Sequence, residues 1–197
     1  MKERILVTGG TGYIGSHTVV ELQNSGYDVV IVDNLSNSSA DVVDNIEKVS
    51  GIRPAFEKLD CLDLEGMDKL FTKYPGIKGI IHFAASKAVG ESVQKPLLYY
   101  RNNLVSLINL LELMPKHGVE GIIFSSSCTV YGQPDVLPVT EEAPIKKAES
   151  PYGNTKQINE EIIRDTVASG SPINAIMLRY FNPVSYTHLT LPTTSRV

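Results

Sequence analysis

Short, almost continuously apolar segments alternate with longer amphipathic ones along this chain of 197 residues. The apolar segments are typical of strands that are covered on both faces of a parallel sheet, and they lie at residues 4–8, 28–32, 54–59, 79–83, 121–125 and 174–179. Helical patterns separate them at residues 13–25, 40–50, 64–73, 97–116 and 152–168. Because strand and helix alternate in this way, the sequence predicts right-handed βαβ units and an α/β fold with a doubly wound parallel sheet.

A glycine-rich loop follows the first strand. Gly9, Gly12 and Gly15 have GxxGxxG spacing, and a helical pattern begins at Tyr13. Glycine allows a tight turn and a close approach of a pyrophosphate, and a helix start offers unpaired N–H groups to phosphates. Glycines also serve simple turns, but the position between a strand and a helix is the one that a dinucleotide-binding loop requires. The sequence therefore predicts a Rossmann-type domain.

The second predicted strand is followed by Asp33. A carboxylate there can accept hydrogen bonds from an adenosine ribose and would repel a 2′-phosphate, which favours NAD over NADP. Asp33 could instead be a polar strand end, because Asp-Asn-Leu-Ser suits turns. Asp60, after the third strand, could meet the adenine edge or serve as a cap. His82, inside the fourth strand, is interpreted as a core histidine.

Tyr152 and Lys156 form the candidate catalytic pair. Four residues apart on a helix, they share one face. A phenol has a pKa near 10, and a nearby ammonium together with a positive nicotinamide ring is expected to lower it. Tyr152 could then take a proton from a sugar hydroxyl while hydride leaves for the cofactor. Ser127 closes the fifth strand and could hold that hydroxyl, although the serine run there could also satisfy loop backbone.

Composition excludes several other classes of function. The net charge is −4 with both signs scattered, so no basic stripe is present for a nucleic acid. No apolar run approaches the ~20 residues that span a bilayer. Cys61 and Cys128 show no metal-ligand spacing, so no metal site is expected, and they fit a reduced cytoplasmic setting.

With these motifs placed, the chain resembles the UDP-glucose (UDP-galactose) 4-epimerases of the extended short-chain dehydrogenase/reductase family. The resemblance rests on TGGTGYIGSHT from Thr8, DNLSNS from Asp33, HFAASKAVGESVQKP from His82, FSSSCTVYG from Phe124, SPYGNTK from Ser150 and LRYFNP from Leu178. Cys128 stands where an alanine is usual, and Ala85-Ser86 replaces Gly-Leu. A 4,6-dehydratase would show Asp-Glu after Thr129, where this chain has Val130-Tyr131.

The resemblance implies reversible inversion at the sugar C4 of a UDP-sugar with NAD retained. Tyr152 would be the base, Lys156 its partner, Ser127 the ligand of the 4-hydroxyl, and Asn182 a contact to the nucleotide-sugar. The expected cofactor contacts, the glycine loop and the catalytic pair included, are Gly9, Gly12, Tyr13, Ile14, Gly15, Asp33, Asn34, Leu35, Ser36, Asn37, Ser38, Asp60, Cys61, Phe83, Ala84, Ala85, Ser86, Lys87, Asn102, Tyr152, Lys156 and Phe181. Such relatives are typically cytoplasmic homodimers that pair through the helix after Lys95 and the Tyr152 helix.

The resemblance ends at Val184. Relatives continue with a Gly-Ala loop and a substrate domain, whereas residues 185–197 form no periodic pattern. We therefore expect an NAD-binding domain over 1–184, with the substrate domain missing, and a non-homologous tail read from foreign or out-of-frame DNA over 185–197. The alternatives are an epimerase of another UDP-sugar, either an N-acetylhexosamine or a uronic acid, and a non-catalytic NAD-binding module.

Overall fold

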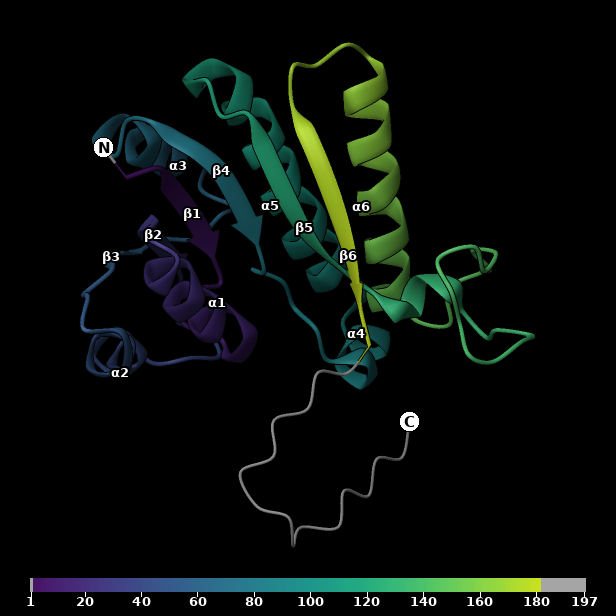
Figure 1. Ribbon diagram of the computed structural model, residues 1–197. Coiled ribbons are helices and arrows are strands. Elements are labelled where there is room, and N and C mark those ends of the chain that lie inside the picture. Colours follow the sequence, from purple (N-terminus) through teal and green to yellow (C-terminus); the bar gives the residue numbers. More distant parts are fainter. Residues whose placement is uncertain (1, 182–197) are drawn as a thin grey trace, which may run out of the picture.

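The computed structural model describes residues 2–181, which form a parallel sheet of six strands. The strands are β1 (Arg4–Thr8), β2 (Asp28–Asp33), β3 (Ala55–Lys58), β4 (Ile77–His82), β5 (Gly121–Ser127) and β6 (Asn174–Tyr180), in the order β3-β2-β1-β4-β5-β6 (Figure 1). The predicted doubly wound α/β fold is confirmed, with strand ends shifted by a few residues. Asn182 and the segment 185–197, for which the sequence predicts a substrate contact and a tail, lie outside the described residues.

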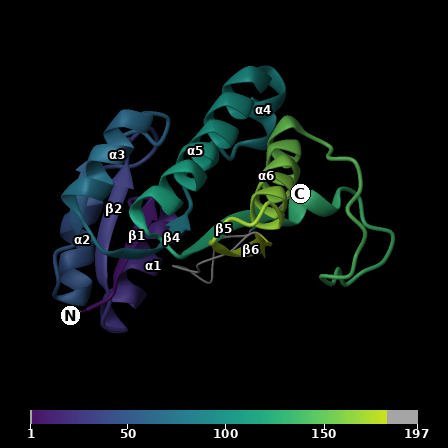
Figure 2. The same cartoon turned by 90° about the horizontal axis from the view of Figure 1, so that it is seen from above.

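Helices cover the sheet in two layers (Figure 2). The helices are α1 (Tyr13–Asn24), α2 (Asp41–Ser50), α3 (Leu64–Lys73), α4 (Val89–Gln94), α5 (Pro96–His117) and α6 (Pro151–Ala168), with a 3₁₀ turn, η1 (Cys128–Tyr131). The core residues of α1 and α2 pack on one face of the sheet, and those of α3, α5 and α6 on the other. The sequence analysis predicted neither α4 nor η1, because each is too short to show a helical period. No helix within residues 2–181 has both the length and the apolar character needed to cross a membrane.

The buried strands explain why their sequences are apolar throughout. Successive side chains of a strand point to opposite faces. Leu6 packs in the cluster with α3, α5 and α6, whereas the next residue, Val7, packs in the cluster with α1 and α2, and both are fully buried. Both faces of β1 therefore require apolar residues, which removes the alternation seen in half-exposed strands.

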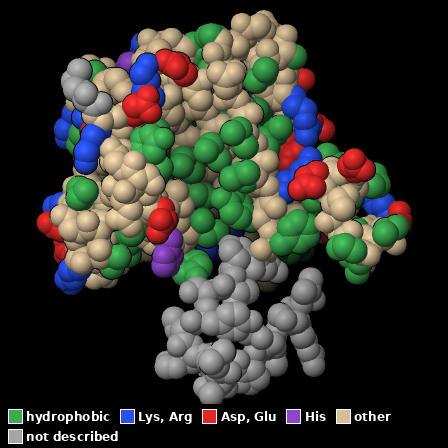
Figure 3. Space-filling view, viewed as in Figure 1, with side chains coloured by type: hydrophobic (Ala, Val, Ile, Leu, Met, Phe, Trp, Pro, Cys, Tyr) green, Lys and Arg blue, Asp and Glu red, His purple; other side chains and the backbone are tan. Residues whose placement is uncertain are grey.

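One part of the sheet lacks this double cover. Ile176 and Leu178 of β6 are 57% and 40% exposed, and they lie on the opposite face from Ala175 and Met177, which pack against the core. Figure 3 shows apolar side chains gathered over the middle of this face, where β4, β5 and β6 run in Figure 1. Patches of this kind are typical of surfaces that contact further protein.

The strand order defines where a ligand can bind. The chain proceeds from β1 to β2 and β3 on one side and then returns to β4, β5 and β6 on the other. The strand order therefore reverses between β1 and β4, and the carboxyl ends of the strands at such a point are where doubly wound sheets bind nucleotides. The glycine loop, Asp33 and Ser127 all lie at this edge of the sheet, because each follows or ends a parallel strand.

Candidate functional site

The glycine loop is held in a conformation that only glycine permits. Gly9 has a φ of +70°, and a Cβ at this position would lie 2.7 Å from the backbone nitrogen of Ala84, beyond β4. A Cβ at Gly15 would lie 2.9 Å from the Cα of Gly10 and still closer to the carbonyl oxygen of Gly9. The loop is closed by a hydrogen bond from the Gly12 N–H to the Gly9 carbonyl at 3.1 Å. The backbone is therefore packed too tightly for side chains at Gly9 and Gly15.

The amino end of helix α1 is available to an anion. Gly12 is its N-cap residue, and no side chain caps this end among the described residues, although Asp63 caps α3 and Ser150 caps α6. No acidic side chain lies in the first turn of α1. The unpaired N–H groups and the helix dipole at this end favour a phosphate. The loop and the helix start thus fit a dinucleotide.

Asp33 lies at the carboxyl end of β2 and organises the loop beside it. Its carboxylate accepts hydrogen bonds from the Thr11 N–H at 3.2 Å, the Leu35 N–H at 2.9 Å and the Ser38 hydroxyl at 3.2 Å. The Leu35 φ of +61° belongs to this tight turn. Asp33 therefore acts as a turn residue, and the same carboxylate faces the glycine loop, where the ribose role would need it.

Asp60 and Cys61 follow β3 and lie near this loop. The Asn34 amide donates to the Asp60 carboxylate at 2.9 Å, and the Leu62 N–H donates to the same carboxylate at 2.9 Å. Cys61 is buried, and burial raises the pKa of its thiol to about 12. Asp60 is thus a turn residue that links the ends of β2 and β3, whereas the cap of α3 is Asp63. The contact of Asp60 with the adenine remains a prediction.

Two consecutive asparagines of α5 hold the segment that follows β4. The Asn103 side chain accepts from the Ser86 N–H at 2.8 Å and donates to the Ser86 carbonyl at 3.0 Å. It also donates to the Thr155 hydroxyl on α6 at 3.0 Å, and Asn102 donates to the Ser86 hydroxyl at 3.1 Å. Asn102 was predicted as a cofactor contact, whereas Asn103 was missed. Its buried position marks it as the link between the β4 loop and the catalytic helix.

Ser127, Tyr152 and Lys156 come together at the carboxyl end of β5. The Tyr152 side chain lies beside Ser127, and this neighbour lowers the pKa of the phenol. The Lys156 ammonium donates to the Ser125 carbonyl at 2.7 Å and lies 5.8 Å from the centroid of the Tyr152 ring. Ser150 caps α6 by accepting from the Gly153 N–H at 3.1 Å, which fixes the helix start that carries Tyr152.

The pKa of Tyr152 differs from the expectation. Burial raises it above the ordinary value, and the neighbouring Ser127 side chain only partly opposes this effect. The expected lowering by Lys156 is therefore wrong for the described residues alone. Lys156 is also buried, and burial lowers its pKa to about 8, so part of the lysine is neutral near neutral pH. A phenolate at Tyr152 requires an additional positive charge in the site.

His82 is a core residue, as expected. Its Nδ1 lies 2.7 Å from the Thr8 hydroxyl, and its ring stacks on Phe124 with centroids 6.0 Å apart. Burial lowers the pKa of His82 to about 3, so the imidazole is neutral and serves packing.

The burial of Lys156 predicts how the stability of the fold depends on pH. Because the pKa of Lys156 is about 8 when folded and 10.5 ordinarily, the unfolded chain binds more protons between these values. The free energy of unfolding therefore increases as the pH rises through this window. Below the window the full cost of burying the charged lysine is present. We expect Lys156→Met to stabilise the domain by about 2 kcal/mol near pH 7 and much less near pH 10. Denaturant unfolding at both values checks this, and a variant no more stable than wild type at neutral pH would contradict it.

The remaining predicted contacts are spread along the same edge. Tyr13, Ser36, Asn37, Lys87 and Phe181 have exposed side chains, which leaves them free to meet a ligand. Ile14, Ala85 and Phe83 are partly buried there. Their contacts with a cofactor remain predictions.

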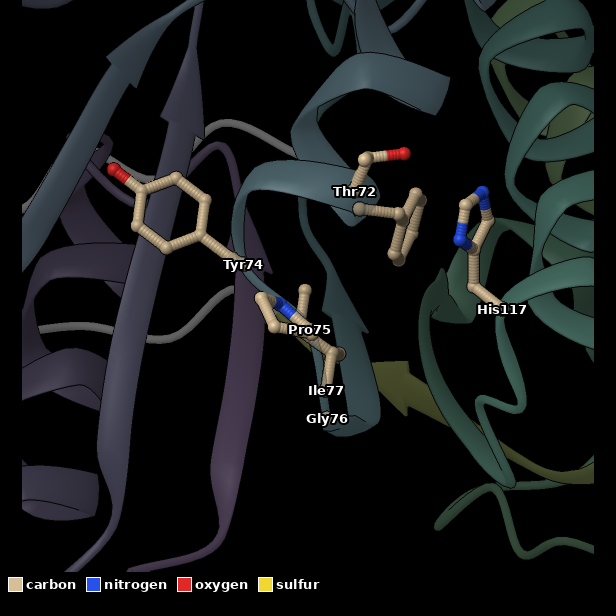
Figure 4. Close-up of a pocket in the computed structure, with 7 residues that line it drawn as sticks. Thr72, Tyr74, Pro75, Gly76, Ile77 and His117 are labelled. Carbon is tan, nitrogen blue, oxygen red and sulfur yellow. The ribbon is translucent and has the colours of Figure 1, made fainter.

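One hollow in the surface lies away from this site (Figure 4). It has a volume of about 280 Å³ and is lined by Phe71, Thr72, Tyr74, Pro75, Gly76, Ile77 and His117. These residues end α3 and α5 and precede β4, so the hollow lies at the amino edge of the sheet, opposite Tyr152. It takes no part in the candidate site.

Known proteins resemble this chain strongly. The family model described as NAD dependent epimerase/dehydratase family matches residues 5–196. A UDP-glucose 4-epimerase of Bacillus subtilis (strain 168) is 51% identical over 179 residues, which cover 91% of this chain and 52% of the relative. A human UDP-glucose 4-epimerase is 49% identical, and the match covers 93% of this chain and 54% of the relative.

A solved structure agrees with this resemblance. The Bifidobacterium longum UDP-glucose 4-epimerase, in complex with NAD+ and UDP, has a TM-score of 0.89 and 48% identity, covering 92% of this chain and 54% of that one. The chain thus spans about half the length of the relatives it matches. Since the family model spans nearly all of this sequence, the chain belongs to the NAD dependent epimerase/dehydratase family.

Proposed function

We propose that residues 1–184 are the NAD-binding domain of an enzyme that interconverts UDP-galactose and UDP-glucose by transient oxidation at the sugar C4. The observation that carries the proposal is the meeting of Tyr152, Lys156 and Ser127 at the sheet edge that also holds the glycine loop. The names of the relatives agree with this chemistry.

The residues present fit NAD. The glycine loop and the open end of α1 would take the pyrophosphate, and Asp33 would take the adenosine ribose, which excludes a 2′-phosphate. The predicted contacts after β3 and β4 would line the rest of the cofactor. Bound NAD supplies the hydride acceptor and donor, together with a positive ring charge that favours the Tyr152 phenolate.

The protein side chains then have distinct roles. Ser127 would hold the sugar 4-hydroxyl beside Tyr152, which would take its proton and later return it. The Lys156 ammonium donates a hydrogen bond to the Ser125 carbonyl. From there its positive charge would stabilise the phenolate. Asn182 would contact the nucleotide-sugar. Burial disfavours the charged forms of both side chains, because it raises the pKa of Tyr152 and lowers that of Lys156 to about 8.

We also propose a cytoplasmic homodimer. The two cysteines are free, which fits a reducing compartment. Leu97, Leu98 and Ile108 of α5 and Val167 of α6 are large apolar side chains with exposed surface on the helices that would pair. We also propose that residues 185–197 are a tail that is not homologous to the relatives.

We expect negligible turnover from the chain by itself, because it spans only about half the length of the relatives that it matches. Joining residues 1–184 to the second half of the Bacillus subtilis relative is expected to give a fusion enzyme that interconverts UDP-galactose and UDP-glucose. Product analysis by chromatography, together with calorimetry of NAD binding, checks this. A folded, NAD-binding fusion without turnover would contradict the proposal, and so would rapid turnover by the chain alone.

A second candidate is the epimerase of a UDP-N-acetylhexosamine. The Campylobacter jejuni UDP-Glc/GlcNAc 4-epimerase has a TM-score of 0.85 and 37% identity to this chain, covering 91% of this chain and 53% of that one. Supplying several UDP-sugars to the fusion separates the two, although its second half contributes to the choice. A non-catalytic NAD module is disfavoured because Tyr152, Lys156 and Ser127 are all retained.

A further inference from the structure

The catalytic helix packs against the end of β5 at three successive turns. Tyr152 of α6 lies beside Ser127, and the Lys156 ammonium donates a hydrogen bond to the Ser125 carbonyl at 2.7 Å. One turn further along α6, the Glu160 carboxylate accepts a hydrogen bond from the Ser126 hydroxyl at 2.6 Å. Residues spaced by four on a helix lie on one face, so a single face of α6 contacts three consecutive residues of β5. Only the third of these contacts lies outside the proposed chemistry.

Glu160 is a buried charge with a complete set of partners. Its side chain is 1% exposed. Besides Ser126, it accepts two hydrogen bonds from the Arg179 guanidinium at 2.9 and 2.8 Å and one from Arg164 at 2.6 Å. Burial alone would raise the pKa of this carboxyl, but hydrogen bonds from Arg179 and Ser126 hold it below the ordinary value. Buried ion pairs contribute little net stability compared with apolar residues, so a role in fixing the geometry is the better account.

The same carboxylate also contacts β6, the strand next to β5. Arg179 lies on β6 directly opposite Ser126 of β5 in the strand register. Its guanidinium lies 4.8 Å from the centroid of the Tyr131 ring, which stacks on Phe181 with centroids 6.3 Å apart. Glu160 therefore joins α6, β5 and β6 at Ser126, the residue next to Ser127 in the chain.

We propose that Glu160 is a positioning residue, which through Ser126 sets the register of β5 against α6 and thereby holds Lys156 on the Ser125 carbonyl and Ser127 on Tyr152. The proposal rests on the proposed function, because it takes Tyr152 and Lys156 to be the reacting pair. A slip of β5 along α6 would disturb both of these contacts at once, since the three β5 residues are adjacent in the chain.

The pKa of Lys156 reports on this register. Its ammonium is surrounded by the Phe124 ring at 4.8 Å and the Tyr152 ring at 5.8 Å, with neutral His82 nearby. Burial holds its pKa at about 8. If Glu160 positions the strand, its loss admits water beside Lys156 and raises that pKa. If Glu160 acts only through its charge, its loss removes a negative neighbour and lowers it.

The test is an NMR titration of the 197-residue chain labelled with [ε-¹³C]lysine, without NAD or nucleotide-sugar. The Lys156→Arg variant assigns the resonance. We expect Glu160→Gln to raise the pKa of Lys156 by about 0.5 to 1 and Ser126→Ala to raise it by a smaller amount. Ser126→Ala leaves both arginine pairs in place, so it keeps the test decisive should Glu160→Gln fail to fold. The matched control is Glu161→Gln, the same change at the exposed neighbouring residue, which should leave Lys156 at about 8.

Each outcome has one meaning. A rise in both folded variants, without a rise in the control, supports positioning. An unchanged or lowered pKa in folded Ser126→Ala and Glu160→Gln overturns it and leaves Glu160 with a structural or purely electrostatic role. Because no cofactor or substrate is present, an inactive fusion enzyme would refute the proposed function without touching this result.

Discussion

Tyr152→Phe is expected to lower kcat of the fusion enzyme by about 10²- to 10⁴-fold, which is the usual contribution of a positioned general base. The change removes one oxygen and keeps the ring, so α6 and the packing around Lys156 stay in place. Affinity for NAD and the KM for the UDP-sugar should change by only a few fold, because the lost group acts on the proton that moves during the reaction. Steady-state kinetics with UDP-galactose, with NAD affinity measured by calorimetry, provides the check.

The matched control for this change is Tyr74→Phe. It removes the same atom from a tyrosine that donates to Glu57 at the opposite edge of the sheet. It should leave kcat within about twofold, since surface substitutions usually have small effects. Equal kcat values for Tyr152→Phe and wild type would show that another group takes the proton, and the assignment of Tyr152 as the base would fail.

Gly15→Ala is expected to weaken NAD binding by about 10- to 100-fold or to abolish it. The new Cβ would meet the Gly10 Cα at 2.9 Å and the Gly9 carbonyl at a still shorter distance, so the loop must move away from the helix start. Forced overpacking of this kind costs about 1–3 kcal/mol, and each 1.4 kcal/mol is about tenfold in affinity. Calorimetry of NAD binding to the 197-residue chain measures the effect.

Gly90→Ala is the appropriate comparison. It makes the same change in helix α4, where a Cβ meets nothing within 4 Å and the backbone has no positive φ. Helix propensity favours alanine there by about 1 kcal/mol, so stability should rise slightly and NAD affinity should stay unchanged. If Gly15→Ala bound NAD as tightly as Gly90→Ala, the glycine loop would not be the pyrophosphate site.

The sequence by itself determined the fold class and the identity of the candidate residues. Continuous apolar strands, the glycine loop from Gly9 and the Tyr152–Lys156 spacing are local patterns, because they depend on the backbone and side chains of neighbouring residues. The strand that ends at Asp33 and the helix that carries Tyr152 therefore appear where the patterns place them. The core position of His82 was also correctly predicted, since a polar residue inside an apolar strand must find a partner.

Only the tertiary structure decided how these residues act on each other. The pKa of Tyr152 is raised because burial outweighs its neighbours, and burial is a property of the packed site that the Tyr152–Lys156 spacing cannot show. Asn103 forms hydrogen bonds with Ser86 and Thr155, which are distant from it in the sequence, and no local pattern identifies it. Glu160 continues the helical spacing of Tyr152 and Lys156, but its meaning depends on Ser126 and Arg179, which the parallel register of β5 and β6 brings together. Contacts between strands distant in sequence are set by packing of the whole sheet, so they emerge only when the chain is folded.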